Sequence, residues 1–386
     1  MTSSTTPGQS GPEQAGYVAL REQRFGDAER VFAQLSAEHE REPQYAFGLA
    51  MALYGQRALE PTLEALARCC RIEPGFVHAW LYAGTINEQL GRLEAAAAAY
   101  LRAIRLTDRF DPKLLPAEVN EMLDLGSRVV RQRLAVELDG KLYACSRQHG
   151  TEALSRIRAG VDYFVGRAKP DFGLSQYRPS LFFVPGLKAE RVHELASVPG
   201  LKELTASFES LRAEALALAR DPEASDAWIN AGEHALYPLV RQGELNESNA
   251  ARLPMAAVLL PVFAELHRVP RAAPNIQLIR IPAKGKIPQR YGSVNARLMA
   301  LWLLSEPGAN GGTAVQYGTD RRPFAAGELR LIDECFEHAI VNDSDSEMLL
   351  LNFDVWNPQL SAAEREAFAS VMSASADYES WLITAN

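Results

Sequence analysis

Residues 78–108, HAWLYAGTINEQLGRLEAAAAAYLRAIRLTD, have the pattern of two helices joined at Gly91. Small and large apolar residues recur at helical spacing in both halves: Trp80, Ala83 and Gly84 in the first, and Ala96, Tyr100 and Ala103 in the second. Residues at i, i+4 and i+7 share one face of a helix, so each half predicts one helix with an apolar face. The small residues let two such helices approach closely, and the large ones fill the space between pairs.

The same pattern occurs three times, with a period of 34 residues. The corresponding positions are Phe25, Leu59 and Leu93; Gly16, Ala50 and Gly84; Ala28, Thr62 and Ala96; and Phe32, Leu66 and Tyr100. A helix-turn-helix unit of this length and small/large order resembles tetratricopeptide repeats. The resemblance implies an α-solenoid over residues 13–108, in which each repeat packs on its neighbours and leaves a concave face open.

The first helix of each repeat is expected to present side chains to that concave face. From the 34-residue period, we expect these side chains to be Tyr17, Leu20, Phe47, Met51, Tyr54, Leu81 and Thr85. They form either a partner-binding groove for a peptide or protein, or a surface that packs against the rest of this chain. The set lacks the Lys/Asn pairs that would clamp a C-terminal carboxylate, so that mode of peptide binding is not expected.

The charge balance and the hydropathy pattern exclude several classes of protein. The chain has 386 residues, a net charge of −8 and a pI near 5.5, and no basic run of the kind that nucleic-acid binding needs. No apolar run approaches the roughly 18 residues of a membrane span, and the N-terminus lacks a secretory pattern. Four cysteines form neither a disulfide framework nor a metal knuckle. We therefore expect a cytoplasmic protein that binds neither nucleic acid nor membrane.

Proline and glycine mark where the domains are expected to divide. The segment RAKPDFGLSQYRP, residues 167–179, is the best candidate for a boundary. Before it we expect a disordered N-terminus over 1–12, the solenoid, and a helical cap and connector over 109–170. A second domain then occupies 171–386. The fold class predicted is an α+β multidomain protein.

The second half changes from helical to strand-like patterns. Helical stretches are expected over 189–221 and 246–267. Short apolar runs separated by turn residues follow, at 275–281, 296–304, 313–318, 327–334, 338–343 and 347–356. Several short strands at this spacing indicate a β-sandwich or a barrel.

Four segments of this half carry a family resemblance: SLFFVPGL (180–187), IPAKGKIPQRYGSVNARL (281–298), FEH (336–338) and NFDVWNPQLSAAER (352–365). Together, and in this order, they resemble the aspartyl/asparaginyl β-hydroxylase family. The resemblance implies a double-stranded β-helix, or jelly roll, with flanking helices over residues 171–386. It also implies oxygenase chemistry that needs Fe(II), 2-oxoglutarate and O2.

The resemblance further implies where metal and cofactor should be held. Two histidines bind the metal in that family, and an arginine ten residues past the second pairs with 2-oxoglutarate. When the family pattern is placed on this sequence, its second histidine corresponds to His338. Its first histidine corresponds to Leu301 and its arginine to Met348. Two further histidines of the family pattern fall on Arg290 and Asn357.

These departures favour a binding protein over an enzyme. A leucine donates nothing to a metal, and one imidazole cannot retain Fe(II), which needs several ligands. Without a cation, a buried 2-oxoglutarate carboxylate would be strongly disfavoured. The leading hypothesis is a peptide- or protein-binding pseudo-oxygenase with a degraded iron site, no catalytic residue and no cofactor.

An active 2-oxoglutarate-dependent dioxygenase is the alternative, hydroxylating a peptide Asp or Asn or a small molecule. It needs a site rebuilt around His338, with a carboxylate from Asp333, Glu334 or Asp354. Arg297 and Arg330 would then bind the anionic cofactor, and Fe(II) would be required. A third interpretation is that the jelly roll only stabilises the solenoid.

Overall fold

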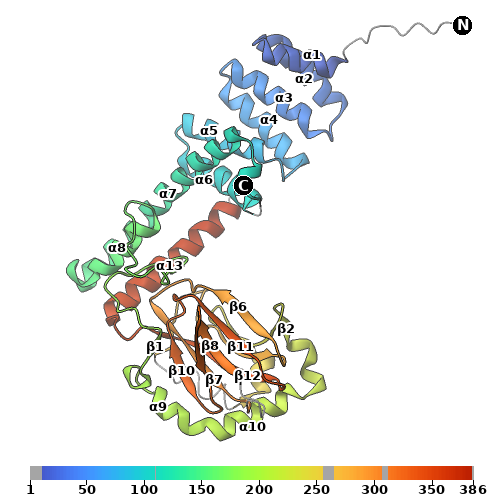
Figure 1. Ribbon diagram of the computed structural model, residues 1–386. Helices are drawn as coiled ribbons and strands as arrows, with labels where there is room; N and C mark the ends of the chain where they lie inside the picture. The colour runs from blue at the N-terminus through green and yellow to red at the C-terminus, as the bar shows by residue number, and fades with distance from the viewer. Residues whose placement is uncertain (1–10, 109, 255–264, 307–311, 385–386) are drawn as a thin grey trace, which may run out of the picture. The chain divides into compact units, whose positions relative to one another are not determined.

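The computed structural model describes residues 11–108, 110–254, 265–306 and 312–384 (Figure 1). The chain separates into two compact units, residues 1–136 with 377–386, and residues 137–376. Two long helices, α7 (Ala117–His149) and α13 (Ala362–Thr384), contribute to both units. Most of the N-terminus expected to be disordered, residues 1–10, lies outside the described residues.

The first unit is built from helices, of which the first six pack each against the next along the chain. They are α1 (Pro12–Arg21), α2 (Phe25–Glu38), α3 (Pro43–Gly55), α4 (Leu59–Ile72), α5 (Val77–Gln89), α6 (Leu93–Thr107), the short η1 (Pro112–Leu114) and the first part of α7. The pairs α1–α2, α3–α4 and α5–α6 form the three repeats. The predicted helical solenoid is confirmed.

Tyr100 shows why small residues recur at fixed positions in the repeats. Its side chain is fully buried. A Cβ added at Gly84 or at Gly126 would come within 2.6 Å of the Tyr100 ring. The aromatic ring on α6 is therefore enclosed by glycines of α5 and α7, and a larger side chain at either position would collide with it.

The second unit contains two antiparallel sheets preceded and followed by helices. Before the sheets come η2 (Glu152–Leu154) and α8 (Ser155–Phe164), and within the unit lie η3 (Leu195–Ser197), α9 (Leu201–Leu204), η4 (Thr205–Ser207), α10 (Phe208–Ala219), η5 (Pro222–Ala227) and α11 (Glu247–Ala251). No helix within the described ranges is long and apolar enough to cross a membrane.

The larger sheet has the strand order β1-β10-β7-β12-β5-β3-β2, with β4 beside β3. These strands are β1 (Val192–His193), β2 (Ile229–Asn230), β3 (Ala235–Arg241), β4 (Glu244–Leu245), β5 (Ile276–Ile281), β7 (Arg297–Leu303), β10 (Leu329–Ile332) and β12 (Met348–Trp356). The smaller sheet has the order β6-β11-β8-β9, from β6 (Lys286–Arg290), β8 (Thr313–Tyr317), β9 (Asp320–Pro323) and β11 (His338–Asn342). Two antiparallel sheets of this kind confirm the predicted α+β class and jelly-roll architecture.

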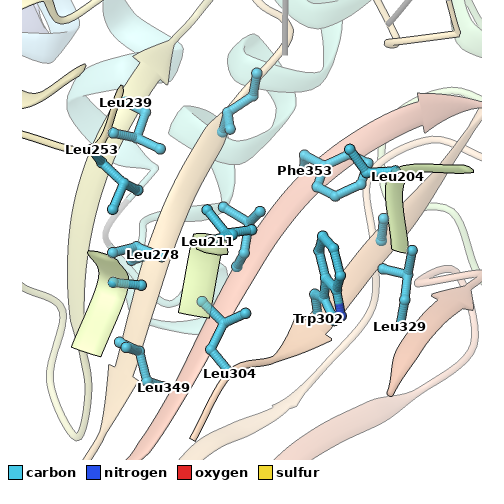
Figure 2. Packing of buried hydrophobic residues seen from close by; sticks show 14 of the residues in the cluster. Leu204, Leu211, Leu239, Leu253, Leu278, Trp302, Leu304, Leu329, Leu349 and Phe353 are labelled. Atoms are coloured by element: carbon cyan, nitrogen blue, oxygen red, sulfur yellow. The ribbon is translucent and has the colours of Figure 1, made fainter. Parts of the chain in front are cut away.

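The larger sheet buries both of its faces. Side chains alternate along β7, so Leu301 faces one apolar core and Trp302 the other. The core around Trp302 is covered by α9 and α10, with Leu204 and Leu211 packed against the sheet (Figures 1 and 2). The core around Leu301 also contains Ile340 of β11, so it lies between the two sheets.

The two helical stretches expected in this half are only partly helical. Residues 189–221 contain β1 as well as α9 and α10, because Val192 and His193 pair with β10. In 246–267 the structure shows α11, and Leu266 forms a bridge with Val355. Residues 255–264 lie outside the described part of the chain.

Candidate functional site

The two residues to which the resemblance assigns a metal-binding histidine and a 2-oxoglutarate arginine, Leu301 and Met348, lie inside an apolar core. Leu301 on β7 is 0% exposed and Met348 at the start of β12 is 1% exposed. Both belong to the cluster between the two sheets, with Ile279, Ile340 and Phe336. Neither side chain can bind a cation or an anion, and both contribute to stability by burial, at about 2 kcal/mol each.

The resemblance assigns the second metal-binding histidine to His338, and its hydrogen bonding indicates which ring nitrogen carries the proton. It begins β11 opposite Arg290 of β6 and is 1% exposed. Its Nδ1 lies 2.9 Å from the carbonyl oxygen of Phe336. A carbonyl only accepts, so Nδ1 carries the proton, and Nε2 is a buried acceptor with no hydrogen-bond partner among the described residues.

Burial lowers the pKa of His338, and the Arg290 guanidinium lowers it further, although hydrogen bonding to Phe336 and the Glu334 carboxylate oppose this. The imidazole is therefore neutral at pH 7. A neutral imidazole with a free Nε2 can bind a metal. Whether this region can hold one therefore depends on the other side chains near His338. In the part of the chain that the structure describes, no group of three His, Cys, Asp or Glu side chains is placed to hold a metal.

Two of the carboxylates proposed for a rebuilt site are bound to Arg297 instead. The Arg297 Nε donates to Glu334 Oε1 at 2.8 Å, and Nη1 donates to Asp354 Oδ2 at 2.8 Å. The Glu334 and Asp354 side chains are 7% and 6% exposed. Removing either carboxylate from Arg297 to serve a metal would break a buried ion pair, which costs about 3–5 kcal/mol.

The pKa values within this ion triad follow from burial and charge. Burial alone would lower the pKa of Arg297, but the Asp354 and Glu334 carboxylates raise it above its ordinary value. Burial raises the pKa of Asp354 to about 6, against the attraction of Arg297. The triad has two carboxylates for one guanidinium, so it leaves no cation for 2-oxoglutarate. Arg297 is placed as a structural cation.

Arg330, the other arginine expected to bind the cofactor, is also occupied. It is 9% exposed, and its Nε donates to Glu328 Oε1 at 2.8 Å. Its Nη2 donates to the carbonyl of Pro323 at 2.6 Å, and its guanidinium carbon lies 4.7 Å from the centre of the Phe324 ring. The donor set around His338 thus does not fit an iron and 2-oxoglutarate centre, and we derive no chemistry through one.

Asp333, the third carboxylate named for a rebuilt site, is buried, and no cation among the described residues forms an ion pair with it. It is 0% exposed, and its Oδ1 accepts from the amide of Cys335 at 3.0 Å. Burial raises the pKa of Asp333 to about 7, and the neighbouring Glu334 adds to the increase. A carboxyl group of this kind is partly protonated at neutral pH.

Several residues of the family motifs have structural roles that the sequence did not reveal. The Asn295 side chain donates to and accepts from the backbone of Val184, both at 2.8 Å, and so ties down the VPG segment. Asn357, where a histidine was implied, donates to the carbonyl of Asn295 at 3.2 Å. The motif residues that remain in this chain therefore hold the fold together.

In the repeats, the residues proposed for the partner-binding groove divide into two groups. Tyr17 is 38% exposed, and Leu20, Phe47, Met51 and Tyr54 are half-buried. Leu81 was wrongly placed in the groove: it is 0% exposed and packs in the core with Tyr100 and Val119. The Thr85 hydroxyl hydrogen-bonds to the carbonyl of Leu81 and the hydroxyl of Tyr100, so it is directed into the repeat.

A connected aromatic surface occupies this region, and sequence reasoning found only part of it. The aromatic face, as we call it, consists of Phe47, Tyr54, Phe76, His78 and Tyr82. Tyr82 links its two halves, with ring centres 5.9 Å from Phe47 and 5.8 Å from Tyr54. Tyr82 was missed because the repeat arithmetic selected its neighbour Leu81; the large aromatic side chain beside it was the available signal.

The buried carboxyl of Asp333 generates a prediction about pH. Its pKa is higher in the folded state than the ordinary 3.8, so the folded protein binds the proton more tightly, and stability falls as pH rises from about 4 to about 7. Asp333→Asn should remove this component and become more stable than the wild type at pH 8, by up to about 4 kcal/mol. Urea unfolding of both proteins across this pH range measures it.

At pH 4 the two proteins should have nearly equal stability, because protonated Asp333 resembles asparagine. Parallel stability curves for wild type and variant over the whole range would show that Asp333 is ionised at the same pH in the folded and unfolded states.

Both the N-terminal and the C-terminal part of the chain match known protein families. Residues 205–358 match the family model for aspartyl/asparaginyl beta-hydroxylase, and residues 14–68 and 56–112 match a tetratricopeptide repeat model. The aspartyl/asparaginyl beta-hydroxylases of Mus musculus and Homo sapiens are each 25% identical over 245 residues, which is 60% of this chain and 32% and 31% of those proteins. The chain thus spans about a third of the length of these relatives.

Among solved structures, a Cupin 2 conserved barrel domain protein from Salinispora arenicola is similar, with a TM-score of 0.24 and 14% identity over 38% of this chain and 92% of that one. Residues 205–358 thus match the aspartyl/asparaginyl beta-hydroxylase family model in the unit that holds the two sheets, and they follow residues that match tetratricopeptide repeats.

Proposed function

We propose that this chain is a non-catalytic binding protein, in which the helical repeats hold a segment of a partner protein and the jelly roll no longer carries out oxygenase chemistry. The observation that carries the proposal is the placement of Leu301 and Met348 in a closed apolar core at the two positions where the family pattern requires a histidine and an arginine. Near this core, Arg297 pairs with Glu334 and Asp354, and Arg330 pairs with Glu328.

The energetics of this core support the proposal. An ion or a dicarboxylate placed beside Leu301 and Met348 would lose its hydration without gaining a partner, at a cost of several kcal/mol per charge. Restoring the site would need two new polar side chains in a core that is packed without them. One polar substitution alone, at Leu301 or at Met348, would leave the iron and 2-oxoglutarate site incomplete. A shift of one existing side chain would not complete it either.

The repeats supply the binding surface in this proposal. Half-buried Phe47, Tyr54 and Tyr82 present aromatic rings that bury large areas at a small cost in side-chain entropy. The Tyr82 hydroxyl donates to Glu118 at 3.3 Å, so an acidic group borders the aromatic face. Such a surface suits an internal peptide segment with apolar side chains better than a C-terminal carboxylate.

One observation favours the alternative of an active dioxygenase. The Nε2 atom of His338 is buried, unprotonated and without a partner among the residues described, as a metal ligand would be before the metal binds. An unpartnered Nε2 is equally expected if His338 is kept while the other metal-binding histidine is replaced by Leu301. A binding experiment separates the two.

The first test is the melting temperature of the full chain with Mn(II) and 2-oxoglutarate, separately and together, without oxygen. A ligand that binds the folded state raises the melting temperature by mass action. We expect no joint shift, and the same result for His338→Ala. A joint shift that is present in the wild type and absent in His338→Ala would support the dioxygenase alternative and contradict our proposal.

The second test concerns the aromatic face. Peptides selected by display against the full chain should bind Tyr82→Ala at least about tenfold more weakly, because a central aromatic anchor is removed. Tyr82→Phe, which loses only the hydrogen bond to Glu118, should bind nearly as the wild type does. Tyr143→Ala, at a 67% exposed tyrosine of α7, is the matched control. Selected peptides that bind Tyr82→Ala as well as the wild type would show that the aromatic face is not the site.

A further inference from the structure

We infer that the jelly-roll unit has a binding pocket for an organic anion, apart from the positions where the resemblance implies metal and cofactor ligands and from the surface used in the proposed function. The pocket has a volume of about 470 Å³. It lies between the segment around Gln176, the approach to β1, and β9. Its ligand would be a carboxylate or phosphate head attached to an apolar body. The inference does not depend on the iron site or on the helical repeats.

Two guanidinium groups line this pocket and meet at one carboxylate. The Arg191 Nη1 donates to Asp320 Oδ2 at 2.9 Å, and the Arg322 Nε donates to the same oxygen at 3.2 Å. Both arginines belong to the pocket lining. Two positive charges share one negative charge, so the cluster has an excess of one positive charge.

Several contacts hold the Arg191 side chain besides its bond to Asp320. Its Nη2 donates to the side-chain oxygen of Gln176 at 2.8 Å, and its backbone carbonyl accepts from the Tyr317 hydroxyl at 3.0 Å. Its guanidinium carbon lies 5.4 Å from the centre of the Tyr317 ring and 5.8 Å from that of Phe336. A cation held in this way loses little side-chain entropy when it binds a ligand.

Arg322 is the more available of the pair. Its side chain is 44% exposed, and its guanidinium carbon lies 5.9 Å from the Tyr317 ring. Its bond to Asp320 uses Nε, so the two terminal nitrogens retain donors for a planar anion. A carboxylate or a phosphate is the group that a pair of guanidiniums recognises best.

The other lining residues define the rest of the ligand. Leu174, Ala189, Val192 and Phe336 supply apolar surface, and Ser175 and Gln176 supply polar groups. The lining carboxylate, Glu190, ion-pairs with Lys188 and so adds little net charge. An anion with a short apolar body therefore matches this pocket better than a bare inorganic ion.

The experiment uses benzoate and phenyl phosphate as anionic probes, and benzyl alcohol as a neutral probe of similar shape. Binding to the full chain is measured by calorimetry or ligand-observed NMR at low ionic strength, because salt screens such contacts. We expect at least one anion to bind, and benzyl alcohol to bind far more weakly. Phenyl phosphate binding more tightly than benzoate identifies a phosphate head, and the reverse order identifies a carboxylate.

The variant Arg322→Gln should weaken binding of the preferred anion by about tenfold or more, because a charge-assisted pair is lost. Arg321→Gln is the matched control: it removes the same charge from the same strand, but Arg321 pairs with Asp343 and does not line the pocket. Its affinity should stay within about twofold of wild type.

Three results would overturn the inference. They are no binding of either anion, equal binding of benzyl alcohol, or equal losses in Arg321→Gln and Arg322→Gln. Thermal unfolding of both variants checks that they are folded. Both side chains are 40% or more exposed, and Arg322→Gln also loses the contact of its guanidinium with the Tyr317 ring.

Discussion

The interaction on which the jelly roll depends is the buried contact of Arg297 with Glu334 and Asp354. It joins β7, the turn after β10 and β12, which lie far apart in the sequence. Gly292 is part of the same arrangement, since a Cβ there would lie 2.2 Å from Cγ of Glu334. The triad gives Gly292 and Arg297 of the segment 281–298 structural roles that require no metal.

The triad also restricts what the interior can do. Glu334 and Asp354 are committed to a buried cation, and freeing either one would leave an unpaired charge. Leu301 and Met348 complete the apolar core between the sheets. The interior between the sheets is therefore stabilised by burial of apolar surface, with the buried ion pairs of Arg297 beside it.

Much of the fold was predictable from the sequence because it follows from periodicity. The 34-residue repeat predicted the helix pairs, and each of the six expected apolar runs contains a strand. Strands β3, β6 and β9 were missed because proline or several charged residues interrupt them: Pro238 in β3, Pro288 in β6, and Arg321 with Arg322 in β9. Tertiary pairing overrides local preference in such edge or irregular strands.

The site was less predictable, because the sequence does not show which side chains meet. That Leu301 and Met348 replace polar residues could be read from motif positions, whereas the pairing of Arg297 with Glu334 and Asp354 required the sheet register. Leu81 was assigned to the wrong side of its helix, since the repeat arithmetic does not resolve neighbours one residue apart. The pocket at Arg191 and Arg322 is lined by residues more than a hundred positions apart in the sequence, and no local motif predicts it.

The most direct test of the central claim is the ¹⁵N NMR spectrum of the His338 imidazole, assigned by its loss in His338→Ala. Our account predicts a neutral ring with the proton on Nδ1, and signals that do not change when Mn(II) and 2-oxoglutarate are added together. Selective paramagnetic broadening of the Nε2 signal under the same conditions would show that a metal binds at His338, and would contradict the claim that this core no longer holds one.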